Sequence, residues 1–196
     1  PIDLALGKPP TKGLLLWLSA DYGISKDGSG KISAWKSQGP LTLSLVQPDP
    51  KHQPTWSAKK VGGQPAVHGD GGNLWLGLQP TAAQAKTFTS VQATGDNRVI
   101  SGLSTDGGSD WLRGKGFKVT DGMAAAAKPD DVVVMLTDAE LTTPLAALSL
   151  GTMHSGGYTG FTGDLAEVLI YQGALAPSVT EGIVENLRAK YTLPKP

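Results

Sequence analysis

Short hydrophobic runs separated by turn sequences repeat roughly every ten residues along the chain. The run GLLLWLSA at 13–20 is apolar throughout, as expected of a buried strand, whereas TLSLVQ at 42–47 alternates apolar and polar positions. Glycine- and aspartate-rich sequences such as DGSG, DGGN and STDGGSD lie between the runs. Many short strands joined by such turns indicate a β-sandwich of the jelly-roll kind.

Most of the chain is expected to form one all-β domain. Residues 1–12 are predicted to be an extended lead-in, because Pro9 and Pro10 disfavour a helix. Residues 13–193 are predicted to form a single domain, since a chain of 196 residues can bury one substantial core. Further strands are expected at 64–68, 73–79, 87–93, 98–104, 116–120, 131–137, 145–150 and 163–172.

The segment 177–191 has the periodicity of an amphipathic helix. Its apolar residues Val179, Ile183, Leu187 and Tyr191 recur every four positions, and Pro177 suits the first helical position. We therefore expect one C-terminal α-helix packed on the β domain.

Composition excludes several classes of protein. The chain has 17 basic and 17 acidic residues and no run of Lys or Arg, so we expect no nucleic-acid partner. It has no cysteine, which excludes disulfides and thiolate ligands. No apolar run approaches the ~18 residues that a membrane-spanning helix needs.

Three stretches resemble the concanavalin A-like, laminin-G-like jelly-roll domains of bacterial surface and secreted proteins. They are GLLLWLSADYGISKDGSGKISAWKSQ at 13–38, QPTW…VGGQPAVHGDGGNLWL at 53–76, and FTGDLAEVLIYQGALAPSVTEGIVENLRAKYTL at 161–193. The resemblance implies a jelly-roll sandwich with a terminal helix. It implies less about function, because the family includes lectins, adhesion modules, hydrolases and passive spacers.

The chain departs from this family at three positions. Family members often carry Asp where this chain has Ser19 and Ser37, and an aromatic residue where it has His68. If those acids hold a metal or a polar network in the family, part of it is missing here.

Two acids in the apolar run GDLAEVLIYQ, Asp164 and Glu167, are the first catalytic candidates. Side chains three apart in a regular strand point to opposite faces, so without a bulge the two carboxyls cannot share a site. A glycosidase needs two carboxyls on one face. No Gly-x-Ser-x-Gly nucleophile motif is present, and His52, His68 and His154 are scattered. We therefore expect a protein that is not an enzyme.

Calcium is the one cofactor that the sequence suggests. Asp70 and Asn73 in HGDGGN are the predicted ligands, with Asp106 and Asp110, or Asp21 and Asp27, as alternative pairs. Asp-Gly sequences also commonly form turns, in which the Asp side chain bonds to nearby backbone. The alternative is therefore that these residues only stabilise turns.

A carbohydrate-binding site is predicted at polar loops that carry aromatic residues. We expect Trp111 at a loop tip, with Tyr158 nearby in HSGGYTG and the polar groups of Asp106, Asp110 and Arg113 around them. Such aromatics serve equally well as anchors for a protein partner, or are partly buried under a loop. Trp17 and Trp35 are expected in the core.

The leading hypothesis is a non-catalytic, lectin-like recognition or adhesion module that binds carbohydrate. We expect it outside the cell, at the cell surface or in the periplasm. The main alternative is a structural subunit that contacts neighbouring protein subunits, in a virion or a larger surface assembly, with the lead-in as its docking arm. A glycoside hydrolase is a third alternative.

Overall fold

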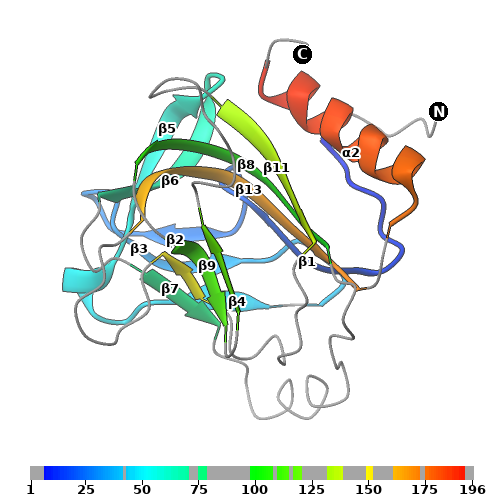
Figure 1. Ribbon diagram of the computed structural model, residues 1–196. Helices are drawn as coiled ribbons and strands as arrows, with labels where there is room; N and C mark the ends of the chain where they lie inside the picture. The colour runs from blue at the N-terminus through cyan, green and yellow to red at the C-terminus, as the bar shows by residue number, and fades with distance from the viewer. Residues whose placement is uncertain are drawn as a thin grey trace.

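The computed structural model shows a two-sheet β protein with a helix at its C-terminal end (Figure 1). It describes residues 7–41, 43–70, 75–78, 98–107, 110–114, 117–120, 132–138, 149–151, 161–172 and 175–192. Among these residues, one α-helix and thirteen strands are present. The fold is therefore an all-β sandwich with a C-terminal helix, which confirms the predicted fold class.

The first sheet has six strands and is built around β13 (Thr162–Tyr171). One side of β13 pairs along its length with β8, while the other side is shared by β6 at its start and β1 at its end. The remaining strands flank this group in the order β11-β8-β13-β6-β5. Their bounds are Leu14–Ser19 for β1, Thr55–Val61 for β5, Gln64–Asp70 for β6, Arg98–Gly107 for β8 and Val132–Asp138 for β11.

The second sheet has seven strands in the order β10-β9-β12-β7-β4-β3-β2. They are β2 (Ile24–Lys26), β3 (Ile32–Lys36), β4 (Ser44–Val46), β7 (Trp75–Leu78), β9 (Asp110–Gly114), β10 (Phe117–Thr120) and β12 (Ser149–Gly151). A single 3-10 turn, Pro50–His52, precedes β5. All neighbouring strands whose pairing the structure describes are antiparallel.

The central strand β13 is buried on both faces, which explains its nearly continuous apolar sequence. Val168 and Ile170 are in register with Leu18 and Leu16 of β1 and face the space between the two sheets. Leu169 belongs to the apolar cluster beneath the helix, on the opposite face. The fold thus has three layers, with β13 in the middle one.

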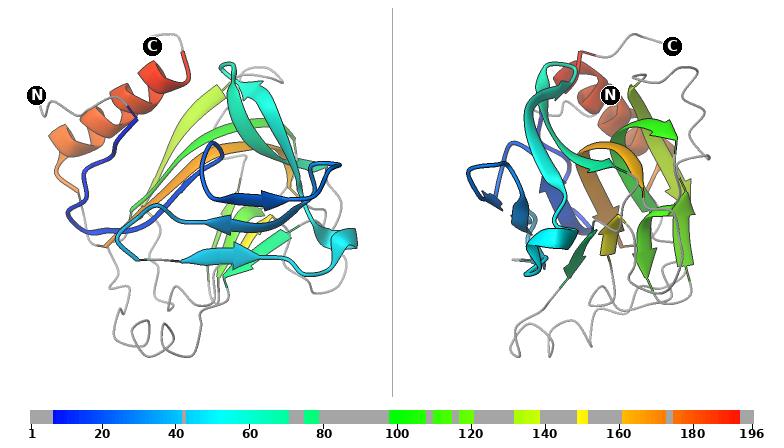
Figure 2. Two further views of the ribbon diagram at one scale, coloured as in Figure 1. Left: turned by 180° about the vertical axis from the view of Figure 1, so that it is seen from behind. Right: turned by 90° about the vertical axis from the view of Figure 1, so that its left-hand side faces the viewer.

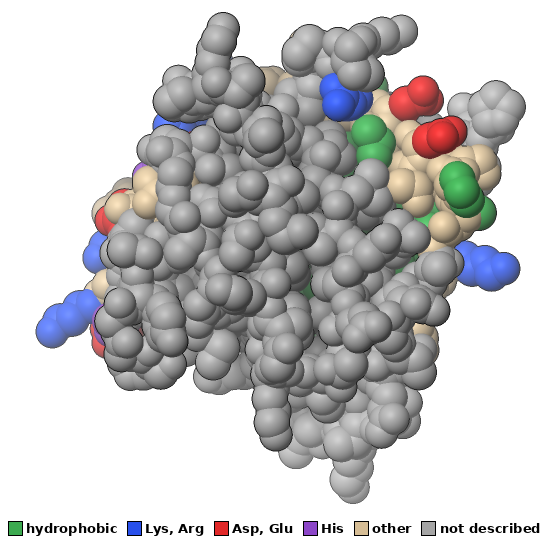
Figure 3. Space-filling view, viewed as in Figure 1, with side chains coloured by type: hydrophobic (Ala, Val, Ile, Leu, Met, Phe, Trp, Pro, Cys, Tyr) green, Lys and Arg blue, Asp and Glu red, His purple; other side chains and the backbone are tan. Residues whose placement is uncertain are grey.

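The helix α2 (Pro177–Lys190) covers the outer face of the first sheet (Figure 2). Ile183, Leu187 and Tyr191 are almost fully buried against it, and Val179 packs beside them, as the four-residue spacing predicts. Figure 3 shows acidic and hydrophobic side chains interspersed where the helix faces solvent. Among the described residues, no helix is long and apolar enough to cross a membrane.

The described part of the lead-in, residues 7–12, runs along α2 (Figure 1). The Gly7 amide donates a hydrogen bond to Asn186 Oδ1 of the helix at 2.8 Å. The Tyr171 hydroxyl donates to the Pro10 carbonyl at 2.9 Å. These bonds connect the start of the chain to both the helix and the sheet that it covers.

Sequence patterns identified most strands, but four, β2, β3, β5 and β9, are absent from the predicted strands. Strands β2 and β3 are short, and β5 and β9 contain polar or charged residues at apolar positions of the pattern. The expected strand 87–93 lies outside the described residues. Trp35 is fully buried, as expected, whereas Trp17 is half-buried and packs against the helix cluster.

The turn between β5 and β6 touches the end of α2 and requires glycine there. Gly62 has a φ of +55°, and a Cβ at this position would lie 1.8 Å from the Tyr191 carbonyl oxygen. The adjacent Gly63 also has a positive φ, of +77°, but open space around it. Gly63→Ala should therefore cost only the left-handed backbone strain, about 1 kcal/mol. Gly62→Ala should cost at least about 2 kcal/mol more, because the helix end must move.

Urea denaturation followed by tryptophan fluorescence measures both free energies of unfolding. Equal losses in the two variants would contradict the contact between this turn and the helix end.

Candidate functional site

The carboxylate of Glu167 is buried at the junction of α2, β1 and β13. It is only 1% exposed and accepts three hydrogen bonds. Trp17 Nε1 donates to Oε1 at 2.7 Å, while Lys190 Nζ and the Tyr191 hydroxyl donate to Oε2 at 2.9 and 2.7 Å. Both oxygens are therefore used within the fold.

Lys190 extends this network to the opening strand. Its ammonium donates to the Ser19 hydroxyl at 2.8 Å and lies 3.4 Å from Asp21 Oδ2. Its side chain is 13% exposed, so the ion pair with Glu167 is largely shielded from water. A buried carboxylate is tolerated only when it is paired and hydrogen-bonded, and this network meets that condition.

Both serines at the family's acidic positions have polar partners. Ser19 accepts from Lys190, and the Ser37 hydroxyl accepts from the Trp17 amide and donates to the Trp17 carbonyl, both at 3.1 Å. Ser19 and Ser37 thus make polar contacts of their own in this chain, and the expectation that part of a family network is missing here stays a prediction. In this chain, serine hydroxyls make the hydrogen bonds that connect β1 to its neighbours.

A β-bulge changes which face the two acids of β13 occupy. Between Leu165 and Glu167 the register with β8 shifts by one residue, so that Asp164 is in register with Ser104 and Glu167 with Gly102. Positions two apart on β8 share a face, so the bulge brings both acids to the outer face of the first sheet. The expectation of opposite faces held only for an unbulged strand.

Asp164 nevertheless has partners of its own. Its Oδ1 lies 2.9 Å from His68 Nδ1, and its Oδ2 lies 3.8 Å from Lys60 Nζ. His68 is the cross-strand neighbour of Asp164 on β6. The two carboxylates thus belong to two separate groups of partners, with Glu167 under the helix and Asp164 beside β5 and β6.

Two tyrosines near Glu167 are held in their neutral form. Burial raises the pKa of Tyr191, and the negative charge of Glu167 raises it further. The pKa of Tyr171 is raised by the same two causes, in the same order. The neutral phenol of Tyr191 can therefore remain a donor to Glu167 well above neutral pH.

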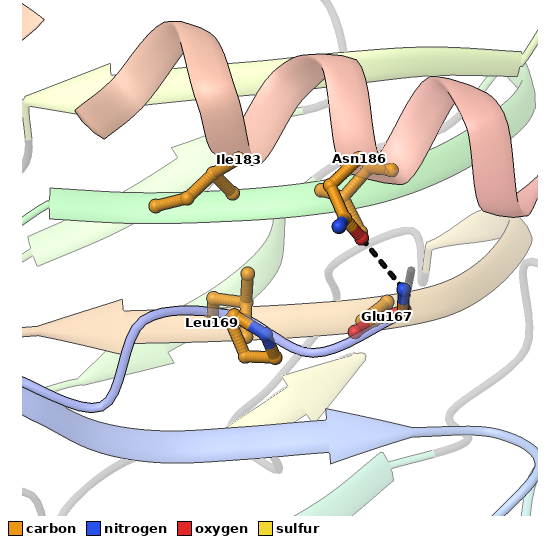
Figure 4. Close-up of a pocket in the computed structure, with 7 residues that line it drawn as sticks. Glu167, Leu169, Ile183 and Asn186 are labelled. Atoms are coloured by element: carbon orange, nitrogen blue, oxygen red, sulfur yellow. Dashed lines mark hydrogen bonds between the residues drawn. The ribbon is translucent and has the colours of Figure 1, made fainter. Parts of the chain in front are cut away.

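The narrow crevice beside Glu167 is a packing seam. Figure 4 shows Glu167 and Leu169 of β13 facing Ile183 and Asn186 of α2, with the lead-in between them. The lining is completed by Gly7, Pro9 and Leu187. The space admits no water-sized molecule, so it offers no room for a ligand in this conformation.

The predicted ligand-binding residues fall on two strands rather than on loops. Asp106 lies near the end of β8, in the first sheet, while Asp110, Trp111 and Arg113 lie on β9, in the second sheet. The expectation of Trp111 at a loop tip is wrong, because residues 110–114 pair with both β10 and β12. Tyr158 lies outside the described residues.

Of the predicted calcium ligands, Asp70, Asp21 and Asp27 have described side chains. Asp70 is the exposed last residue of β6, and Asn73 lies outside the described residues. Asp27 Oδ1 accepts from the Ser29 amide and the Lys31 amide, both at 2.9 Å, and thus closes a turn, whereas Asp21 lies beside Lys190. Hydrogen bonds from Ser29 and Lys31 lower the pKa of Asp27. Within the described part of the chain, no three His, Asp or Glu residues are grouped to hold a metal ion.

Three aspartates come to one end of the sandwich, and we call this the acidic end. Thr162 of β13 is in register with Asp70 on one side and with Gly107 on the other. Asp106 precedes Gly107, and Asp110 begins β9 three residues later. Strand spacing puts the backbones of positions 70 and 107 about 10 Å apart. Residues that are distant in sequence are thus neighbours at this end.

The Glu167 network was not predicted, although the sequence contained a signal for it. A Glu within a continuous apolar run needs a buried cation or several donors. Lys190, beside the last residue of the helical stripe, could supply the cation.

Glu167→Gln should lower the free energy of unfolding by about 3 kcal/mol, because it leaves the largely buried Lys190 ammonium with only the more exposed Asp21 as a counter-charge. Adding Lys190→Met should recover part of that loss. Lys60→Gln is the matched control, since the Lys60 side chain is 44% exposed and its pair with Asp164 should contribute less than about 1 kcal/mol. Chemical denaturation of five proteins, the unaltered chain, Glu167→Gln, Lys190→Met, the double variant and Lys60→Gln, measures the coupling, and strictly additive losses for Glu167 and Lys190 would contradict it.

Alkaline pH should destabilise the protein through its buried tyrosines. An unfolded tyrosine ionises near pH 10, whereas the raised pKa values keep Tyr171 and Tyr191 protonated in the folded state. Their contribution is fully present below about pH 10, and each then loses about 1.4 kcal/mol per pH unit. Tyr191→Phe should flatten this decline, at a cost of about 1 kcal/mol at pH near 8. Denaturant midpoints measured from about pH 8 to about pH 11 give the loss of stability with pH. If Tyr191→Phe leaves this loss per pH unit unchanged, Tyr191 does not contribute to it.

Comparisons with known proteins identify no family. No protein-family model and no curated protein matches the chain. It is similar to solved structures of the sialidase of Trypanosoma rangeli, with 13% identity and a TM-score of 0.42 for the complex with sialic acid, and 14% and 0.43 for the complex with 2,3-difluorosialic acid. Both alignments cover 95% of this chain, which spans about a third of those sialidase chains, 34% and 35%. The resemblance to concanavalin A-like domains stays a prediction.

Proposed function

We propose that this chain is a non-catalytic, lectin-like recognition module that binds carbohydrate on an exported or surface protein. The observation that carries the proposal is the acidic end, where the backbones of Asp70, Asp106 and Asp110 come to the same end of the sandwich beside a strand that contains Trp111 and Arg113. Carboxylates and a guanidinium supply both acceptors and donors for sugar hydroxyls, and an aromatic ring supplies a stacking surface. The same carboxylates could hold calcium, which binds through oxygen ligands.

The use of the two acids of β13 within the fold supports a role without catalysis. A general acid or nucleophile must reach the substrate, but Glu167 is buried and gives both its oxygens to Trp17, Lys190 and Tyr191. Asp164 is held by His68 and Lys60. The crevice that Glu167 lines admits no water-sized molecule and therefore no sugar ring.

The lead-in gives little support to the alternative of an assembly subunit. A docking arm should extend away from its own domain, yet Gly7 and Pro10 are hydrogen-bonded to Asn186 and Tyr171. The described part of the lead-in is therefore part of the packing of this domain. We favour the recognition module for this reason.

A glycan array probed with the purified chain should show specific binding, and Trp111→Ala should reduce it by about tenfold or more, as expected for loss of an aromatic anchor. Tyr22→Ala is the matched control, because Tyr22 is an exposed aromatic residue, 46% accessible, on the turn before β2. The array is repeated in EDTA, where loss of binding would assign a metal to the site. A blank array from folded protein would overturn the proposal, and cleavage of a bound glycan would overturn its non-catalytic part.

A further inference from the structure

A row of aligned positions crosses the second sheet at right angles to its strands, and we call it the outer row. It begins at the edge strand with Lys118, which pairs with Arg113 of β9. Arg113 is in register with Ser149 of β12, and Ser149 with Gly77 of β7. The two cations therefore lie at one end of the row, followed by two small residues.

The outer row continues with small residues to the opposite edge of the sheet. Gly77 is in register with Val46, Val46 with Ala34, and Ala34 with Ser25 of the other edge strand. Between Arg113 and this edge, no residue of the row is larger than valine. Small residues along a row allow a ligand to come close to the sheet backbone.

The outer row lies on the face of the sheet that points away from the core. The next positions on the same strands, Trp35, Leu45 and Leu150, are buried, and side chains alternate along each strand. Where the structure describes the side chains of the row, Ser25 is exposed and Ala34 and Val46 are half-exposed. The outward face is thus the accessible one in the described part of the row.

Charge is unevenly divided between the two sheets, although the chain as a whole is balanced. The strands of the second sheet contain four Lys or Arg residues, Lys26, Lys36, Arg113 and Lys118, and one acid, Asp110. The strands of the first sheet contain three Lys or Arg and five Asp or Glu. The second sheet is therefore the more favourable of the two for an anion.

We propose that the outer row binds an acidic oligosaccharide, carboxylated or sulfated, with its anionic group at Arg113 and Lys118. The proposal rests on the proposed function and names both the surface and the ligand class. An arginine guanidinium binds a carboxylate or sulfate through two parallel hydrogen bonds, and the adjacent ammonium adds a second charge. Serine hydroxyls and the absence of bulky side chains suit a chain of sugar rings lying across the strands.

The composition of the row favours a glycan over a nucleic acid. Single-stranded nucleic acids need aromatic platforms for their bases and several cations for successive phosphates. The row itself contains no aromatic residue and has only two adjacent cations. A nucleic acid is therefore a control in the test.

Isothermal titration calorimetry of the intact chain tests the proposal, with oligogalacturonate, a heparin-derived oligosaccharide, uncharged cellohexaose and a single-stranded DNA as probes. We expect one of the acidic sugars to bind at least about tenfold more tightly than cellohexaose and the DNA. Arg113→Gln should weaken that binding about tenfold or more, and Ala34→Tyr should obstruct the middle of the row while suiting a partly exposed strand position. Lys59→Gln, on the edge strand of the first sheet, is the matched control and should leave binding unchanged.

The outcomes separate this inference from the proposed function. Tight binding of uncharged sugars alone would keep the lectin function and overturn the outer row as an anion site. Equal binding to DNA, or binding that Arg113→Gln leaves intact, would also overturn it. If no sugar binds folded protein, both proposals fail.

Discussion

The burial of one carboxylate, that of Glu167, connects the parts of this protein that are most distant in sequence. A carboxylate without water costs several kcal/mol unless donors replace the lost hydration. Its donors come from β1 and from the end of α2, so the charge is compensated only when the opening strand, the central strand and the terminal helix are all assembled. The same assembly closes the apolar cluster under the helix. Specific docking of the helix and burial of the charge are therefore one event.

The bulge in β13 follows from the same arrangement. On one side of this strand, the pairing with β6 ends before Ala166 and the pairing with β1 begins after it. On the other side, the pairing with β8 continues past this point. One additional residue at that point increases the local twist and turns Glu167 toward the helix. Asp164, before the bulge, stays with His68 of β6. Two acids three residues apart thus acquire different partners on one face.

Sequence alone predicted what depends on local periodicity and missed what depends on register. The buried stripe of Ile183 and Leu187 follows from the helical periodicity of hydrophobic residues, which is visible within the segment's own sequence. A bulge depends on which strands lie on either side, and the same holds for the strand at Trp111, which pairs with the adjacent β10 but also with the distant β12. The acidic end and the outer row are likewise products of pairing between distant segments. The residue types were visible in the sequence, but their proximity was not.

The location of the helix also bears on where a ligand can bind. By covering the outer face of the first sheet, α2 and the lead-in use that surface for internal packing, and the polar groups there are satisfied by Lys190, Trp17 and Tyr191. A binding surface needs polar groups that the fold itself does not saturate. For this reason the face that the helix covers is a poor place for recognition, and the proposals concern the acidic end and the outward face of the second sheet instead. Arg113 lies on β9, which begins at the acidic end with Asp110 and crosses the outer row of the second sheet. It is therefore the residue that the two proposed binding regions have in common.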